Sequence, residues 1–141
     1  MSKTPPMILL VEDNEDDFEA TQRSLEKNHF INPVHWCQSG QEALDYLFEN
    51  NNKQMPDLVL LDLNMPGIDG RQVLQRIKDN DKTKKIPVII LTTSGDPIDI
   101  EMCYRLGAST YIQKPVNFES LTEAVKTIKD YWFGVAILPK K

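Results

Sequence analysis

Four short apolar runs in this chain each end in side chains that carry a charge or a hydroxyl. The runs occupy residues 7–11, 58–61, 86–91 and 111–113, and they are followed by Glu12 and Asp13, by Asp62, by Thr92 and by Lys114. Short runs that are mainly apolar, as these are apart from Gln113, are typical of strands buried in a parallel sheet. Because open parallel sheets gather functional groups at the carboxyl ends of their strands, we expect these side chains to converge.

The segments between the runs carry the 3.6-residue period of amphipathic helices. The longest is 117–132, with Asn117 as its predicted N-cap, and shorter ones lie at 43–48, 73–77, 16–27 and 98–106, the last ending at Gly107. With a further short run at 34–37, five strands alternate with five helices. This alternation predicts an α/β fold, a doubly wound five-stranded parallel sheet with helices on both faces.

A length of 141 residues suits one domain. We predict a domain over 1–133 and a C-terminal tail over 134–141, with no output domain. A net charge of -5 without a basic stripe argues against a nucleic-acid partner, and no apolar stretch is long enough for a membrane span. Cys37 and Cys103 show no pairing framework and no signal peptide precedes them, so we expect a cytoplasmic protein. The polar stretch 50–54 predicts a loop.

Glu12, Asp13 and Asp62 would repel one another if the sheet brings their carboxylates together. A hard divalent cation relieves that repulsion, and Mg²⁺ prefers oxygen ligands of this kind. Zinc is disfavoured because no His or Cys lies nearby in the sequence. The acidic run is also compatible with a helix start, where negative side chains stabilise the helix dipole. We favour metal binding for Asp13 and the helix-start role for residues 15–17.

Asp62 directly follows a buried strand, and a carboxylate in that place can accept a phosphoryl group as an aspartyl phosphate. The transition state spreads charge over three oxygens, which a metal ion, an ammonium and a hydroxyl can stabilise. Lys114 supplies the ammonium and Thr92 the hydroxyl. Taken singly, Asp62 also fits a turn, Lys114 a surface charge and Thr92 a strand end. Their shared place at strand ends favours phosphoryl chemistry.

Together these motifs resemble the receiver domain of response regulators, the phosphoacceptor half of two-component systems. The matching segments are 11–13, 60–70, 87–92 and 107–115, and the likeness extends to about Tyr131. The resemblance implies the flavodoxin-like receiver fold. It also implies a signalling protein rather than a conventional enzyme, one that catalyses only its own phosphorylation and dephosphorylation.

Carried over to this sequence, the resemblance implies that Asp62 accepts its phosphoryl group from a phosphohistidine on a sensor histidine kinase. It implies a Mg²⁺ site made by Glu12, Asp13, Asp62 and the backbone carbonyl of Asn64. In that site Asp13 binds the ion directly and Glu12 acts through water. The metal and the phosphoacceptor therefore share one carboxylate.

The same resemblance implies a switch. Thr92 is its hydroxyl, which moves toward the phosphate, and Tyr111 is the aromatic side chain that swings inward behind it. Lys114 bridges to the phosphate, and the Lys114–Pro115 peptide is cis. The output is a surface change that another protein, or a second copy of the chain, recognises.

The ending of the chain is similar to that of the small response regulators paired with cyanobacterial and other bacterial phytochromes, which makes a phytochrome the candidate kinase. Large apolar residues near the end exceed what a finished core requires and predict an interface. They are Trp132, Phe133, Val135, Ile137 and Leu138. We predict a homodimer through this segment and the face of the fourth helix, fifth strand and fifth helix. The alternative is that the tail folds back on its own domain.

Two other functions compete with this interpretation. Phosphatases of the haloacid dehalogenase type also use an aspartate nucleophile after an apolar strand, but they place a second acid two residues later, where this chain has Asn64. A docking module that no longer accepts phosphate is disfavoured because Asp13, Asp62, Thr92 and Lys114 are all present. Nucleotide-binding enzymes are disfavoured because no glycine-rich loop follows the first run.

Overall fold

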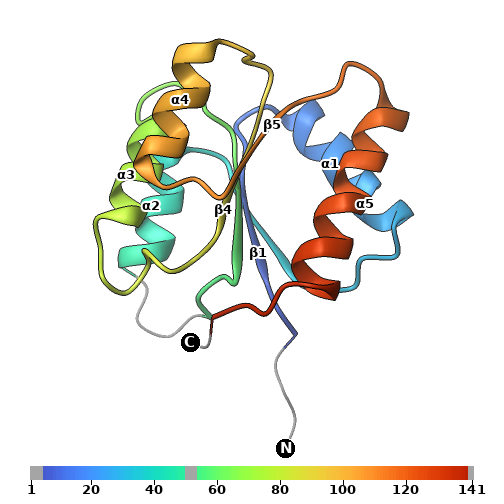
Figure 1. The fold of residues 1–141 in the computed structure, drawn as a ribbon, viewed down its shortest axis with the longest axis horizontal. Coiled ribbons are helices and arrows are strands. Elements are labelled where there is room, and N and C mark those ends of the chain that lie inside the picture. Colours follow the sequence, from blue (N-terminus) through green and yellow to red (C-terminus); the bar gives the residue numbers. More distant parts are fainter. Residues whose placement is uncertain (1–4, 50–53, 140–141) are drawn as a thin grey trace, which may run out of the picture.

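The computed structural model describes residues 5–49 and 54–139, so the predicted loop at 50–53 and the last two tail residues lie outside the described ranges. Within those ranges, five strands and five helices alternate as predicted (Figure 1). In chain order they are β1 (Ile8–Val11), α1 (Glu15–Lys27), β2 (Val34–Cys37), α2 (Gly40–Phe48), β3 (Leu58–Leu61), α3 (Gly70–Lys78), β4 (Val88–Thr92), α4 (Pro97–Leu106), β5 (Thr110–Gln113) and α5 (Phe118–Gly134). None of these helices is both long enough and apolar enough to cross a bilayer.

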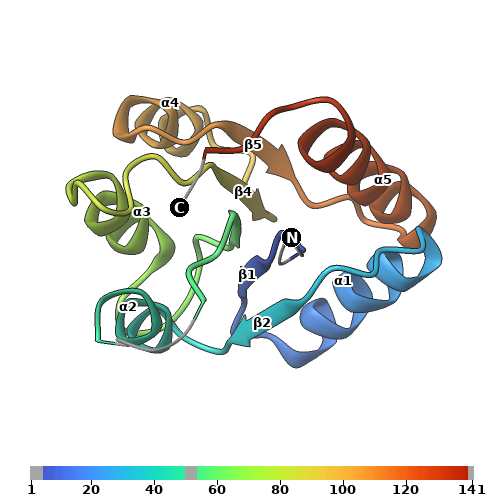
Figure 2. The same ribbon diagram turned by 90° about the horizontal axis from the view of Figure 1, so that it is seen from below.

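The strands form one parallel sheet in the order β2-β1-β3-β4-β5. From β1, an inner strand, the chain goes first to β2 at one edge and then through β3 and β4 to β5 at the other edge, which confirms the doubly wound, flavodoxin-like fold. Helices α1 and α5 cover one face, and α2, α3 and α4 cover the other (Figures 1 and 2). In such sheets the crevice at the carboxyl ends of the two strands where the winding reverses is where ligands bind, here β1 and β3.

Alternate residues of the central strands feed two separate cores. In β3, Leu58 and Leu60 pack toward α1 and α5, whereas Val59 and Leu61 pack toward α2 and α3. All four are buried, and full burial of such a side chain is worth about 1.5–3 kcal/mol. A shift of β3 by one residue relative to its neighbours would move each side chain to the other face of the sheet. Because both faces are apolar, burial alone would not prevent that shift, and the packed helices and the polar residues at the strand ends help to fix the register.

Each helix begins with a side chain that accepts a hydrogen bond from an unpaired backbone N–H of its first turn. These N-caps are Asn14, Ser39, Asp69, Asp96 and Asn117. Asp69 also takes part in a capping box with Gln72. Gly107 ends α4 with φ +110°, a conformation that favours glycine. The predicted roles of Asn117 and Gly107 are confirmed.

The last residues of α5 and the segment after it form the predicted association surface. Helix α5 continues to Gly134, and Trp132 and Phe133 pack against the core on the α1 and α5 side, with the Phe133 and Phe30 ring centroids 5.3 Å apart. Both side chains stay partly exposed, so they are shared between the domain's own packing and the surface, and the predicted interface stays a prediction. Val135 and Ile137 remain exposed.

The backbone after β5 corrects the prediction made for the Lys114–Pro115 peptide. The described residues contain no cis peptide bond, so the Lys114–Pro115 peptide is trans and the predicted cis form is wrong. Trans is the lower-energy isomer of a bond preceding proline by about 0.5–1 kcal/mol unless packing reverses the preference.

Candidate functional site

Three carboxylates meet at the carboxyl ends of β1 and β3. Glu12 and Asp13 follow β1, Asp62 follows β3, and one carboxylate oxygen from each lies within 4.8 Å of the others. Glu12 and Asp62 are buried, and Asp13 lies nearer the solvent. The pairing of Val11 with Leu61 sets the two strand ends level, which is why the following acidic residues become neighbours. The predicted convergence is confirmed.

Glu12 is held at both carboxylate oxygens. Its Oε1 lies 2.5 Å from Lys114 Nζ, and its Oε2 accepts a hydrogen bond from the Asn14 backbone N–H at 3.2 Å. The Trp36 indole N–H donates to the Glu12 backbone carbonyl at 2.8 Å, which fixes the turn after β1. Burial raises the pKa of Glu12 to about 7, and the Lys114 ammonium opposes that shift only in part.

Lys114 lies among the carboxylates. The alternative, a surface charge in solvent, is therefore wrong. Its Nζ lies 2.9 Å from Asp17 Oδ2 and 4.0 Å from Asp62 Oδ2, in addition to the contact with Glu12. Burial works against its charge, but the hydrogen bond that Lys114 donates to Glu12 and the attraction of Glu12, Asp62 and Asp17 outweigh burial and raise the pKa of Lys114. The ammonium is therefore charged at neutral pH.

Asp17 is a site residue that the sequence interpretation missed, because it was assigned only to the helix start. It lies in the first turn of α1, one turn before the buried Thr21 and two turns before the buried Leu25. This spacing of four residues places it on the face of α1 that turns toward the sheet. That position was the available signal, and it brings Asp17 to Lys114.

The backbone around Asp62 is closely packed by the start of α3. The Gly70 N–H donates to the Leu63 carbonyl at 3.0 Å, and a Cβ built on Gly70 would lie 2.1 Å from the Asp62 carbonyl oxygen. Only glycine permits this approach. The loop from Leu63 to Asp69 is thus clamped between the end of β3 and α3, which orients the Asp62 carboxylate. Asn64 is exposed within this loop.

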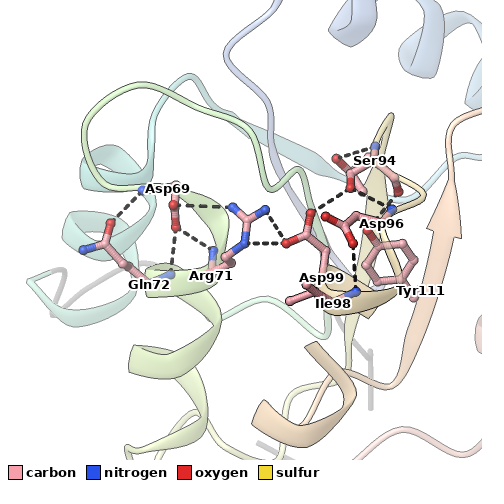
Figure 3. Close-up of polar contacts among 9 residues, drawn as sticks. Asp69, Arg71, Gln72, Ser94, Asp96, Ile98, Asp99 and Tyr111 are labelled. Atoms are coloured by element: carbon pink, nitrogen blue, oxygen red, sulfur yellow. Dashed lines mark hydrogen bonds and ion pairs between the residues drawn. The ribbon is translucent and has the colours of Figure 1, made fainter. Parts of the chain in front are cut away.

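Thr92 and Tyr111 lie on neighbouring strands next to the site. Thr92 ends β4, is fully buried, and its Oγ1 lies 3.5 Å from the Ser94 N–H. The Tyr111 side chain is half-buried and points inward, with its hydroxyl donating to the Ser94 carbonyl at 2.9 Å (Figure 3). Both side chains therefore contact the same residue of the β4–α4 loop.

The residues present suit a hard divalent cation. The donors are carboxylate oxygens, which Mg²⁺ and Mn²⁺ accept and which do not favour softer metals. Among the described residues, Lys114 is the one cation that pairs with Glu12, Asp17 and Asp62, so full ionisation leaves a local excess of negative charge.

These features suit the transfer of a negatively charged group to a carboxylate. Asp62 is buried beside an ammonium, a cation-binding set of oxygens and the end of the Thr92 strand. A phosphoryl group on Asp62 would add roughly -1.5 to -2 charges near neutral pH. The Lys114 ammonium, together with a cation held by the carboxylates, would stabilise that charge.

Known proteins are similar to this chain in sequence. Residues 8–126 match the family described as response regulator receiver domain. The chain is 39% identical over 135 residues to the probable methanogenesis regulatory protein FilR2 of Methanothrix harundinacea, covering 94% of this chain and 87% of that protein. It is 37% identical over 141 residues to response regulator Rcp1 of Synechocystis sp., covering 98% and 96%.

Solved structures agree with these sequence matches. The phosphorylated cyanobacterial phytochrome response regulator RcpA superposes with a TM-score of 0.91 at 40% identity, over 96% of this chain and 99% of that one. The Mn²⁺-bound form of Rcp1 gives 0.90 at 36% identity, over 96% and 100%. The chain therefore belongs to the response regulator receiver family and is a phosphoacceptor signalling protein related to the phytochrome response regulators.

Proposed function

We propose that Asp62 is the phosphoacceptor and that it takes its phosphoryl group from a phosphohistidine of a sensor histidine kinase in a Mg²⁺-dependent reaction. The observation that carries the proposal is the placement of the buried Asp62 carboxylate beside Lys114, Glu12 and Asp13. In the transfer, a carboxylate oxygen bonds to phosphorus while the P–N bond breaks, and its electron pair returns to the imidazole. The product is an aspartyl phosphate.

Asp62 suits this role better than the neighbouring carboxylates. Both oxygens of Glu12 are occupied by Lys114 and by the Asn14 N–H. Asp17 is tied to Lys114 by a 2.9 Å contact. Asp62 lies close enough to Lys114 for attraction, yet at 4.0 Å it leaves space for an incoming group.

Mg²⁺ fits the site with Asp13 and Asp62 as direct carboxylate ligands and the Asn64 backbone carbonyl as a third. Glu12 acts through water, in keeping with its existing contacts to Lys114 and Asn14. When bound, the ion neutralises charge on the transferring phosphoryl group. The relative Rcp1 has a Mn²⁺-bound form, which supports a divalent cation here.

The signal is a change of surface that Thr92 and Tyr111 produce. A phosphoryl oxygen on Asp62 attracts the Thr92 hydroxyl, and the contact both residues make with Ser94 carries that movement to the β4–α4 loop. Lys114 binds another phosphoryl oxygen. Such a differential contact biases two conformations of the domain.

The proposed kinase is a phytochrome, because RcpA is a phytochrome response regulator and matches this chain closely in fold. We place the reaction in the cytoplasm, where a sensor kinase presents its phosphohistidine. The protein catalyses only its own phosphorylation and dephosphorylation. Asn64 stands where a phosphatase of the haloacid dehalogenase type requires its general acid, which disfavours steady hydrolysis of other phosphoesters.

The output we propose is homodimerisation through the face of α4, β5 and α5 and the segment after α5. Met102 and Tyr104 on α4 and Tyr131 on α5 are exposed apolar side chains on that face. Val135 and Ile137 extend it beyond the helix. Burying such side chains between two copies is worth about 1.5–3 kcal/mol each.

The decisive experiment is phosphorylation by acetyl phosphate with Mg²⁺, followed by intact mass. The wild-type protein should gain one phosphoryl group that hydroxylamine removes, and Asp62→Asn should gain none. Asp57→Asn, at the other end of β3, is the matched control and should be phosphorylated normally. Chelating Mg²⁺ should stop the reaction. A persistent label on Asp62→Asn would refute the assignment, and sustained turnover of a small phosphoester would favour the phosphatase alternative.

A further inference from the structure

Helix α4 is held to the domain by little apolar contact. Cys103 is its one buried residue, whereas α3 buries Val73, Leu74 and Ile77 along with Gly70. Ile98 and other large apolar residues of α4 are exposed. The position of α4, and of the loop that enters it from β4, must therefore depend strongly on polar contacts.

One polar cluster joins the first turn of α4 to the first turn of α3 (Figure 3). Arg71 donates to Asp99 Oδ1 twice, from Nε at 3.1 Å and from Nη2 at 2.7 Å. The second Asp99 oxygen, Oδ2, accepts from the Ser94 hydroxyl at 2.7 Å. Asp69, the N-cap of α3, lies 3.5 Å from Arg71 Nη1 and helps orient the guanidinium.

Ser94 connects this cluster to the switch. Its carbonyl accepts the Tyr111 hydroxyl and its backbone N–H faces Thr92 Oγ1. Arg71 and Asp99 thus fix Ser94, to which the inward Tyr111 side chain is hydrogen-bonded. Figure 3 shows the chain of contacts running from Asp69 to Tyr111.

The Arg71–Asp99 pair differs from the surface ion pairs of the same region. The two side chains are 25% and 16% exposed, whereas the Arg105–Glu101 pair on α4 is 76% and 71% exposed. The hydrogen bonds from Arg71 and Ser94 lower the pKa of Asp99. Burial works against the charge of Arg71, but the hydrogen bonds that Arg71 donates to Asp99, together with the attraction of that carboxylate, outweigh burial and raise the pKa of Arg71. Removing one partner of a shielded pair costs more than removing one partner of an exposed pair, because the remaining charge is left without its partner.

We propose that Arg71 and Asp99 are positioning residues that hold the β4–α4 loop and keep Tyr111 inward before phosphorylation. The pair therefore sets how far the resting protein is already biased toward its switched conformation. This inference rests on the proposed switch role of Thr92 and Tyr111. It assigns to α3 a part in a movement that otherwise involves β4, α4 and β5.

The test follows the Tyr111 ring by ¹⁹F NMR in full-length protein labelled with 3-fluorotyrosine, with the Tyr111 signal assigned by Tyr111→Phe. The variants are Arg71→Gln, Asp99→Asn and the double variant. Arg105→Gln, which breaks the exposed pair on α4, is the matched control. Each is measured alone and during titration with beryllofluoride and Mg²⁺, a mimic of the aspartyl phosphate. Circular dichroism checks that each variant is folded.

Both single variants should shift the free Tyr111 signal toward those of the exposed Tyr104 and Tyr131. The beryllofluoride concentration at half-saturation should rise about two- to tenfold, since a smaller inward population lowers apparent affinity. The double variant should resemble the single ones, because the two residues act as a pair, and Arg105→Gln should match wild type. An unmoved Tyr111 signal in both single variants would overturn the inference.

The free-protein signal separates this inference from the proposed function. If wild type is not phosphorylated at Asp62 but Arg71→Gln and Asp99→Asn still move Tyr111, the phosphoacceptor assignment fails and the positioning role stands. If Asp62 is phosphorylated normally and Tyr111 is unmoved, the positioning role fails alone.

Discussion

The ammonium of Lys114 lies 4.0 Å from Asp62 Oδ2, within reach of attraction but beyond a direct hydrogen bond. Its closer partners are Glu12 at 2.5 Å and Asp17 at 2.9 Å. The lysine is therefore held next to the phosphoacceptor by ion pairs with two other carboxylates. A phosphoryl group on Asp62 would offer it new oxygens, and the energetics of the site depend on this exchange of partners.

Replacing Lys114 should weaken binding of the phosphoryl mimic. Lys114→Met removes a charge-assisted hydrogen bond worth about 1.5–3 kcal/mol, or roughly 10- to 150-fold in beryllofluoride affinity. Isothermal titration in saturating Mg²⁺ measures this change. Lys126→Met, which removes an exposed lysine paired with Asp130, serves as control and should bind like wild type. Equal affinity in the Lys114 variant would show that the lysine does not reach the phosphoryl oxygens.

Releasing Lys114 from Asp17 should have the opposite effect. Asp17→Asn removes one negative charge and one partner of the lysine. Because the Asp17 side chain is 42% exposed, we expect the substitution to lower the activation free energy of phosphorylation by only about 0.2–1 kcal/mol. That corresponds to phosphorylation by acetyl phosphate that is about 1.4 to 5 times faster. The rate is measured by quenching the reaction at set times and determining the phosphorylated fraction from the intact mass. Asp16→Asn, in the same helix turn, controls for the helix dipole. Slower phosphorylation of Asp17→Asn would indicate that Asp17 instead holds the lysine in its working position.

Removing the Thr92 hydroxyl should separate phosphorylation from its consequence. In Thr92→Ala, Asp62 should still be phosphorylated, but the phosphoryl-induced shift of backbone amide signals in α4 and β5 should shrink, since coupling of about 1–3 kcal/mol is typical of such switches. Thr92→Ser keeps the hydroxyl and should retain most of the shift. Two-dimensional amide NMR measures both. If the alanine variant responds like wild type, the switch does not use this hydroxyl.

The Arg71–Asp99 pair predicts a defined dependence of stability on pH. The pKa of Asp99 is lowered from 3.8, so near that pH the unfolded chain binds more protons than the native one. The stability that the charged Asp99 contributes is present above about pH 5 and is lost as pH falls below roughly 4. Urea unfolding of wild type and Asp99→Asn should give a difference in unfolding free energy that is constant from pH 5 to 7. The difference should narrow in acid, and a gap that stays unchanged down to pH 3 would contradict the prediction.

Charges placed beyond α5 should prevent self-association. Ile137 is 98% exposed, so Ile137→Glu costs the isolated domain little. Light scattering with beryllofluoride and Mg²⁺ should find dimers of wild type and monomers of the variant, while the thermal unfolding midpoint of the monomer stays unchanged. The substitution is preferable to truncation before Trp132, which would also remove core side chains. Wild type that stays monomeric at high micromolar concentration would refute the dimer.

The sequence alone determined the order of elements and the composition of the carboxyl edge. Apolar runs such as 58–61 are local signals, and a parallel sheet converts the residue after each run into a neighbour of the others. Glu12, Asp13, Asp62 and Lys114 could therefore be grouped before any contact was known. The helix ends at Asn117 and Gly107 were predictable for the same reason, because capping depends on residues within one turn.

Only the tertiary structure decided which side chains meet across elements. Asp17 reaches Lys114 over 97 positions of sequence, and Arg71 reaches Asp99 over 28. It also packed Trp132 and Phe133 in part against the core, where the Phe133 ring lies beside the Phe30 ring. Helical periodicity tells which face of a helix is apolar, but not which partner the packed fold brings to that face. That choice depends on the angles and distances at which helices settle on the sheet, and these are properties of the whole fold rather than of any local segment.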